Sequence, residues 1–183
     1  MIVDKEKLMK ILPYSGLPII LAAMLLLRFR DLEAYDLLRL GLVVIFGYVA
    51  ALSDLKSKRI PNSLILIMLM AWPVIIIPGL FLDIDAAVGN LVDSALGFAI
   101  GGGLFLIVYL VSRKGIGGGD VKFMAVAGLY LGFDRTLPAI LYGTILAALT
   151  GLALIACKKI SRKDKIPLAP FLYAGILVTV LLQ

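Results

Sequence analysis

Two aspartates lie where apolar segments of the sequence end or begin, and this position makes them candidates for a chemical function. Asp120 lies in the glycine-rich stretch Gly115-Ile-Gly-Gly-Gly-Asp-Val-Lys122, and Asp54 follows a different apolar segment. A carboxylate at the mouth of a membrane helix is costly to keep there, so it is a candidate for function. Glycine tolerates positive φ angles and lets another chain come close. Asp54 and Asp120 are therefore the candidate catalytic residues.

Two facing carboxylates can hydrolyse a peptide bond without a metal ion or a covalent intermediate. The ionised carboxylate takes a proton from water, while the protonated one hydrogen-bonds the scissile carbonyl and then helps the amine leave. Like charges at close range cannot both ionise, which separates the two roles. The same pair could instead serve a proton- or cation-coupled transporter, although transport carboxylates usually lie near the bilayer midplane. A third possibility is a structural subunit of a membrane secretion assembly, in which the carboxylates are incidental.

The composition excludes soluble classes of protein and most other catalytic machinery. The chain has 183 residues, of which 62% are hydrophobic and 16% charged, with a mean hydropathy of +1.07. Soluble domains contain about 45–50% apolar and about 25% charged residues, so the composition indicates an integral membrane protein. The sequence has no histidine and a single cysteine, Cys157, which excludes a catalytic triad with histidine, a zinc cluster and a disulfide framework. We expect no metal ion and no cofactor, so carboxylates must carry any proton transfer.

The apolar runs predict an all-α fold, a polytopic transmembrane bundle of about six to seven helices in a single domain over residues 1–183. A helix that crosses a bilayer needs about 20 residues. Apolar runs near this length fall at 11–27, 37–53, 63–82, 95–111, 120–136, 137–156 and 168–183. Pro73 and Pro78 are expected to kink or end the third of these helices. Gly97 and Gly101, spaced as GxxxG, predict close packing of the fourth helix against a neighbour.

The distribution of charge predicts how these helices are oriented. Basic residues gather in four segments of the chain: Lys5, Lys7 and Lys10; Lys56, Lys58 and Arg59; Arg113, Lys114 and Lys122; Lys158, Lys159, Arg162, Lys163 and Lys165. The positive-inside rule places these segments in the cytoplasm and predicts a multi-pass protein of the cell membrane. A loop on the opposite side is expected around Asp83, Asp85 and Asp93, where no basic residue occurs. Seven crossings fit this pattern if residues 28–39 form a loop. Six crossings, with the first helix peripheral to the membrane, are the alternative.

The same rule brings the two aspartates to one side of the membrane. Asp54 and Asp120 both fall at the predicted cytoplasmic edge, on different helices that a bundle could bring together. Orientation also accounts for the net charge of +6, so membrane lipids are expected as partners and nucleic acid is not. Nucleotide-binding loops require other residues, because a Walker loop has Lys followed by Ser or Thr, and a dinucleotide fingerprint has glycine where Asp120 stands.

Three segments of the sequence together resemble a known family. Asp54-Leu-Lys-Ser-Lys-Arg-Ile-Pro-Asn62, Gly117-Gly-Gly-Asp-Val-Lys122 and Lys165-Ile-Pro-Leu-Ala-Pro-Phe171 are similar to the signature blocks of the type IV prepilin peptidases, a family of GxGD-type membrane aspartic proteases. The resemblance covers roughly residues 45–175, with blocks at about 54–62, 115–122 and 165–171. It implies a peptidase that removes the short basic leader of prepilins, pseudopilins or archaeal preflagellins on the cytoplasmic side of the membrane.

The resemblance also implies roles for individual residues. Asp54 and Asp120 correspond to the catalytic pair. Six further residues are expected to bind substrate: Gly117, Gly119, Lys122, Pro61, Asn62 and Pro167. Three basic side chains would repel a basic leader and are expected instead to set orientation and to contact anionic lipid headgroups: Lys56, Lys58 and Arg59. The oligomeric state is left open.

One departure from the family pattern concerns a second activity. Bifunctional members carry a large N-terminal cytoplasmic insertion, often with paired CxxC motifs, that is associated with methylation of the new N-terminus. Here the segment between the first two apolar runs spans only residues 28–39 and contains no cysteine. We therefore expect a peptidase-only enzyme with no separate methyltransferase domain.

Helix dipoles predict which aspartate holds the negative charge. Asp54 would end a helix, where the dipole is negative, and Asp120 would begin one, where the dipole is positive. Asp120 is thus predicted to be the general base and Asp54 to carry the shared proton, a preference of about 0.3–1 kcal/mol per dipole. The two groups are expected to titrate as a coupled pair.

Overall fold

The expected all-α fold is confirmed over the part of the chain that the structure describes. The computed structural model describes residues 34–112, 115–159, 161 and 166–183, together with Gly16 and Ala23. Its helices are α2 (Ala34–Ser57), α3 (Asn62–Leu82), α4 (Ile84–Val111), α5 (Gly118–Ala156) and α6 (Ala169–Leu182), and no strand occurs among these residues. Helices α2 to α5 are long and apolar enough to cross a membrane, and α6 is a shorter apolar helix.

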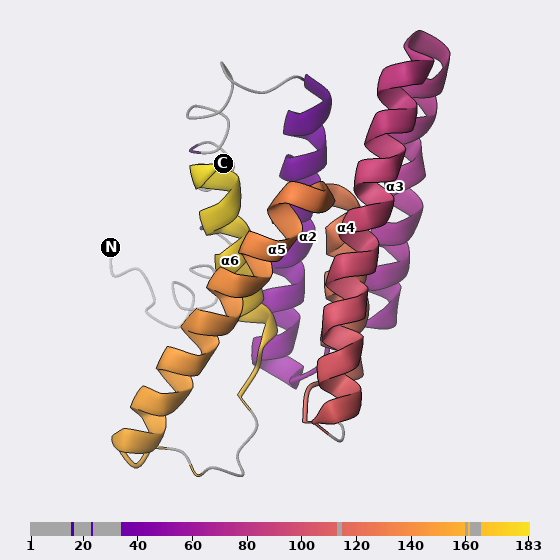
Figure 1. The fold of residues 1–183 in the computed structure, drawn as a ribbon. Helices are drawn as coiled ribbons and strands as arrows, with labels where there is room; N and C mark the ends of the chain where they lie inside the picture. Colours follow the sequence, from indigo (N-terminus) through magenta and orange to yellow (C-terminus); the bar gives the residue numbers. More distant parts are fainter. Residues whose placement is uncertain (1–15, 17–22, 24–33, 113–114, 160, 162–165) are drawn as a thin grey trace, which may run out of the picture.

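The described residues form five helices, fewer than the expected six to seven, for two reasons. The first apolar run, 11–27, lies almost wholly outside the described residues. The runs 120–136 and 137–156 form one helix, α5, which bends at Gly132, where φ is 74° and ψ is −174°. Glycine adopts such a positive φ at little steric cost. The two runs therefore separate at Gly132 rather than after residue 136, into halves that point in different directions (Figure 1).

Two charged segments that the sequence assigns to loops belong to helices. Asp83 alone separates α3 from α4, and its carboxylate caps α4 by accepting a hydrogen bond from the Ala86 N–H at 3.1 Å. Asp93 therefore lies inside α4 and not in a loop. The loop predicted for 28–39 is also wrong at its end, because Arg39 lies in α2 and is only 3% exposed.

Consecutive helices run antiparallel, which gathers several helix ends at one end of the bundle. In Figure 1, α2 and α4 run toward the lower end, whereas α3 and the first half of α5 run away from it. The second half of α5 returns toward the lower end, and α6 then packs against both α5 and α2. The end of α2 and the beginnings of α3, α5 and α6 therefore lie near one another, where the sequence places its three signature blocks. Helix α3 continues through Pro73 and Pro78 as far as Leu82.

Helices α4 and α5 approach so closely that only glycine fits at their contact. A Cβ atom on Gly97 would collide with the backbone of Gly128, and one on Gly128 would collide with the backbone of Gly97. A Cβ atom on Gly101 would likewise collide with the carbonyl oxygen of Met124. The close packing predicted from Gly97 and Gly101 is therefore confirmed, and α5 is the partner helix. Small residues drive helix association in membranes because they permit this backbone contact.

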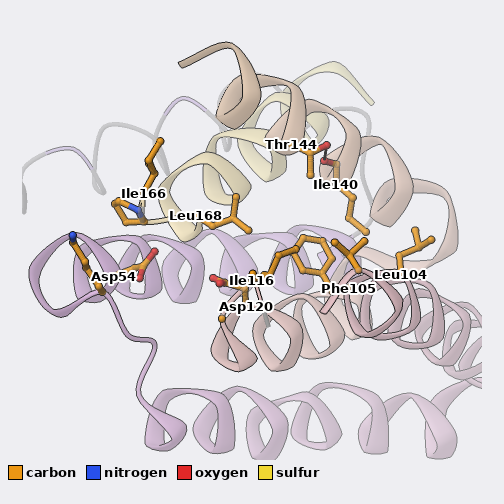
Figure 2. Close-up of a pocket in the computed structure, with 14 residues that line it drawn as sticks. Asp54, Leu104, Phe105, Ile116, Asp120, Ile140, Thr144, Ile166 and Leu168 are labelled. Atoms are coloured by element: carbon orange, nitrogen blue, oxygen red, sulfur yellow. Dashed lines mark hydrogen bonds between the residues drawn. The ribbon is translucent and has the colours of Figure 1, made fainter. Parts of the chain in front are cut away.

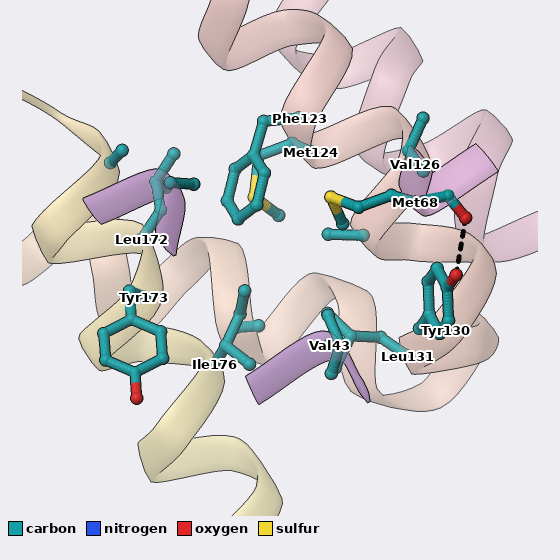
Figure 3. Close-up of a cluster of buried hydrophobic side chains, with 14 of the residues drawn as sticks. Val43, Met68, Phe123, Met124, Val126, Tyr130, Leu131, Leu172, Tyr173 and Ile176 are labelled. Carbon is teal, nitrogen blue, oxygen red and sulfur yellow. Dashed lines mark hydrogen bonds between the residues drawn. The ribbon is translucent and has the colours of Figure 1, made fainter. Parts of the chain in front are cut away.

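The first half of α5 is the centre of the described core. Every residue from 123 to 132 is buried, and Figure 3 shows Phe123, Met124 and Leu131 in one cluster with Val43 of α2, Met68 of α3 and Leu172 of α6. The Tyr130 hydroxyl donates a hydrogen bond to the carbonyl oxygen of Met68 at 2.5 Å, which satisfies its polar group and ties α5 to α3. Asp120 therefore lies at the mouth of the most enclosed helical segment.

The glycine contact gives the first prediction. Gly97→Ala is expected to lower stability by about 1–3 kcal/mol, because the added methyl group must push the α4 and α5 backbones apart. Gly103→Ala is the matched control, since no atom lies within 4 Å of a Cβ atom at that position in the same helix. Thermal unfolding in detergent, followed by circular dichroism, measures both variants. Equal melting temperatures for the two would contradict this view of the contact.

Candidate active site

Asp54 is fixed by the way in which α2 ends. Lys58 adopts a left-handed conformation, with φ of 51°, and its N–H donates to the Asp54 carbonyl oxygen at 2.8 Å. A residue in this conformation commonly ends a helix by satisfying one of its last carbonyl groups. The hydroxyl groups of Ser53 and Ser57 both donate to the Arg59 carbonyl oxygen, at 3.1 and 3.2 Å, and hold the turn. The Asp54 side chain is buried, with 6% of the residue exposed.

Asp120 is fixed by the glycine-rich loop at the start of α5. The Asp120 N–H donates to the Gly117 carbonyl oxygen at 3.1 Å, and the residue is 8% exposed. A Cβ atom on Gly117 would lie 2.8 Å from Oδ2 of Asp120, and one on Gly119 would lie 3.4 Å from Cβ of Ile60. The glycines at 117 and 119 therefore make room for the catalytic candidate itself and for the loop between α2 and α3.

Both carboxylates line one pocket of about 850 Å³ (Figure 2). Asp54 comes from α2 and Asp120 from α5, and Figure 2 shows the two side chains directed toward the same space. The Lys58 side chain adds a positive group to this polar side of the pocket. Most of the remaining lining is apolar: Leu104, Phe105, Val108, Ile116, Ile140, Ile166 and Leu168. The pocket thus offers two carboxylates beside a largely apolar wall.

Helix α6 contacts the site through its backbone. The N–H of Ala169, the first residue of α6, donates to Oδ2 of Asp54 at 3.0 Å. The positive end of α6 therefore faces Asp54, just as the positive end of α5 faces Asp120. This offsets the difference in helix dipoles from which Asp120 was predicted to be the base. The contact fits either protonation state of Asp54, provided that any proton is on Oδ1. Which aspartate is the base stays a prediction.

The six expected substrate-binding residues divide into two groups. Gly117 and Pro167 line the pocket with the aspartates. The other four are absent from its lining: Pro61, Asn62, Gly119 and Lys122. Lys122 Nζ instead donates to Asn62 Oδ1 at 3.0 Å, so these two side chains join the beginnings of α3 and α5. Contact with substrate stays a prediction for all six.

Several lining residues were not predicted from the sequence. Ile140 and Thr144 reach the pocket from the second half of α5, and Phe105 reaches it from α4. Their apolar or small side chains resemble those of any membrane helix, and Ile140 and Thr144 lie beyond the bend at Gly132, which the sequence did not predict. Lys58 was expected at the lipid headgroups, yet it lines the pocket. Among the described residues, no group of three or more potential metal ligands occurs together.

The contact between Asp54 and Ala169 gives the second prediction. Asp54→Asn keeps an oxygen acceptor and removes one of two buried carboxylates, so the melting temperature should be unchanged or higher. Asp54→Leu has the same number of side-chain heavy atoms but leaves the buried Ala169 N–H without a partner, which costs about 1–3 kcal/mol. Circular dichroism melts in detergent compare the two variants. A leucine variant as stable as the asparagine variant would show that the contact does not hold α6.

Comparison with known proteins agrees with the motif analysis. Residues 41–152 match the type IV leader peptidase family. The chain is 28% identical over 134 residues to the prepilin leader peptidase/N-methyltransferase of Bacillus subtilis, with 73% of this chain and 51% of that protein covered. It is 32% identical over 141 residues to the protein of the same name from Burkholderia pseudomallei, covering 71% of this chain and 43% of that protein.

The chain spans about half the length of these curated relatives. No solved structure matches it. The matched segment contains Asp54 and Asp120 and runs from within α2 to nearly the end of α5. The match also exceeds half of the chain. The chain therefore belongs to the type IV leader peptidase family.

Proposed function

We propose that this protein is a membrane-embedded aspartic endopeptidase that removes the short basic leader of prepilin-like or preflagellin-like proteins. The observation that carries the proposal is that two buried carboxylates, Asp54 and Asp120, line one pocket although they lie on different helices. Membership of the leader peptidase family and the names of the curated relatives support the reaction and the substrate class.

The two aspartates divide the work of hydrolysis. The ionised carboxylate takes a proton from a water molecule, and the resulting hydroxide attacks the carbonyl carbon of the scissile peptide. The protonated carboxyl group hydrogen-bonds the carbonyl oxygen, and its proton passes to the amine as the C–N bond breaks. The Ala169 N–H orients Asp54 through Oδ2, which leaves Oδ1 as the oxygen free of that contact. A fixed orientation keeps both groups near the reacting atoms during the attack.

The pocket fits a substrate that lies partly in the membrane. Its polar side, with both aspartates, is formed where α2 ends and α5 begins, and its apolar wall is formed by α4 and the second half of α5. The same end of the bundle carries basic residues at the end of α2 and the start of α5: Lys56, Lys58, Arg59 and Lys122. The positive-inside rule supports a site at the cytoplasmic face of the cell membrane.

A transporter is the weaker alternative. Intramembrane carboxylates that carry ions usually lie near the bilayer midplane beside interrupted helices. Asp54 lies in the last turn of α2 and Asp120 in the first turn of α5, so both occupy helix ends. A boundary position suits cleavage of a peptide that enters from water better than it suits a path across the membrane.

The proposal predicts that cleavage requires both aspartates. The wild-type protein, expressed in membranes with a prepilin-like substrate, is expected to release the leader at a single position. Asp54→Asn and Asp120→Asn should each lower the rate by at least about a thousandfold, because an amide can neither take nor give the required proton. The shift of the substrate band on a gel and mass spectrometry of the product measure the reaction.

Asp134→Asn is the matched control, because Asp134 is an exposed aspartate on the same helix as Asp120 and lies outside the pocket lining. It should cleave at the wild-type rate. Normal cleavage by either pocket variant would exclude the two-carboxylate mechanism. A wild-type protein that never cleaves would favour a transporter or a non-catalytic subunit.

The contact between Lys122 and Asn62 allows a second test, which separates positioning from substrate binding. If their hydrogen bond holds α3 and α5 in place, Lys122→Met and Asn62→Leu should each lower kcat about twofold to fivefold, and the double variant should lose no more. If each side chain contacts substrate independently, the two losses should multiply. Initial rates over a range of substrate concentrations for the four proteins of this double-mutant cycle distinguish the two outcomes.

A further inference from the structure

A cluster of charged side chains lies at a distance from the pocket and has no part in the proposed chemistry. Arg39 of α2 is 3% exposed and makes ion pairs with Asp36 and with Asp93 of α4, both at 3.1 Å. Arg135 of α5 lies 3.9 Å from the second oxygen of Asp36. Buried charges in a membrane protein are costly and are kept where they pair and perform a task. This cluster joins α2, α4 and α5 at the level of the bend in α5.

Asp93 is bonded to the bend itself. Its Oδ1 accepts a hydrogen bond from the Phe133 N–H at 2.8 Å, while Oδ2 is the atom that Arg39 contacts. Phe133 is the first residue after Gly132, so Asp93 satisfies one of the free N–H groups at the start of the second half of α5, as a capping side chain does. A Cβ atom on Gly132 would collide with this carboxylate. The Asp93 carboxylate therefore lies directly against the bend and caps the helical segment that follows it.

The direction of the second half of α5 decides the shape of the pocket. Ile140 and Thr144, which line the pocket, lie two to three turns beyond the bend. The same half packs closely on α6, because a Cβ atom on Gly143 would lie 2.9 Å from Cα of Leu172. Helix α6 in turn begins at Ala169, whose N–H holds Asp54. A rotation at Gly132 would therefore move one wall of the pocket and the helix that orients one aspartate.

We propose that Asp93, held by Arg39, is a positioning residue, whose hydrogen bond to the Phe133 N–H fixes the bend at Gly132 and so sets the width of the pocket. The predicted effect of this hydrogen bond on cleavage rests on the proposed function, whereas its predicted effect on the bend does not. Replacing a buried ion pair by apolar side chains is often neutral. The essential feature is therefore the acceptor oxygen at position 93, and the charge of Arg39 serves to orient it.

The test measures a distance that changes with the angle of the bend. Spin labels are placed on Leu110→Cys in α4 and Leu152→Cys in α5, both strongly exposed, with the exposed Cys157 changed to serine. Leu152 lies about 30 Å along the helix from Gly132, so a rotation of about 15° at the bend moves it by about 8 Å. Pulsed electron paramagnetic resonance of the full chain in lipid nanodiscs reports the distance between the labels.

One pair of variants tests the donor side of the hydrogen bond. Phe133→Pro deletes the N–H, and proline is accepted at the first position of a helix. Phe133→Ala, its control, loses the half-exposed ring and keeps the N–H. Phe133→Pro is expected to shift or broaden the distance distribution by several ångströms and to lower kcat/KM about tenfold or more, mainly through KM. Phe133→Ala should match the parent protein in both measurements.

A second pair of variants tests the acceptor side, in a background where Arg39 no longer faces a neutral side chain at position 93. In an Arg39→Met background, Asp93→Asn keeps the acceptor oxygen, whereas Asp93→Leu of similar size lacks it. The asparagine variant should have the same distance between the labels and the same KM as the parent protein. The leucine variant should show a shifted or broadened distance and a higher KM. Indistinguishable distance distributions within both matched pairs would overturn the proposal. A shifted distance in a protein that never cleaves any substrate would refute the proposed function and leave the role of Asp93 in place.

Discussion

The close contact between the backbones of α4 and α5 is the constraint on which the site depends. Gly97 and Gly128 face each other with no room for a side chain, and Gly101 faces the backbone of Met124. Lipid supplies no hydrophobic force between helices, so association in membranes relies on such contact and on interhelical hydrogen bonds. The contact buries the first half of α5 and places Asp120 at the end of a rigid segment. A carboxylate on a freely moving loop could not keep a fixed distance to its partner.

The antiparallel arrangement of the helices brings together two residues that are far apart in the sequence. Asp54 and Asp120 are 66 positions apart in the sequence, with α3 and α4 between them. Because α3 and α4 are joined by Asp83 alone, they form a tight hairpin that returns the chain to its starting level. The pocket then forms where the ends of α2 and α4 meet the start of α5. Its apolar wall follows from the same arrangement, since α4 and the second half of α5 present membrane-type side chains to it.

The sequence was sufficient for the all-α class and for three of the described helices, and it failed where tertiary contacts decide. Long apolar runs predicted α2, α3 and α6 to within a few residues, because a membrane helix needs only length and hydropathy. Arg39 and Asp93 were assigned to loops, since a lone charge in an apolar sequence is most simply placed in water. They instead form an ion pair between α2 and α4, and no local sequence pattern predicts a pairing between residues so far apart. Gly132 could not be distinguished among the 18 glycines of the sequence, because its positive φ occurs beside the carboxylate of Asp93, which belongs to another helix.

The three signature blocks are best understood as one junction between helix ends. Gly119 of the second block packs against Ile60 of the first, and Lys122 of the second donates to Asn62 of the first. The third block reaches the first through Ala169 and Asp54. Each block therefore contacts another, although several of its residues do not line the pocket. Contacts between motif residues can affect the reaction in their own right, because the distance between two carboxylates on separate helices is set by whatever joins those helices.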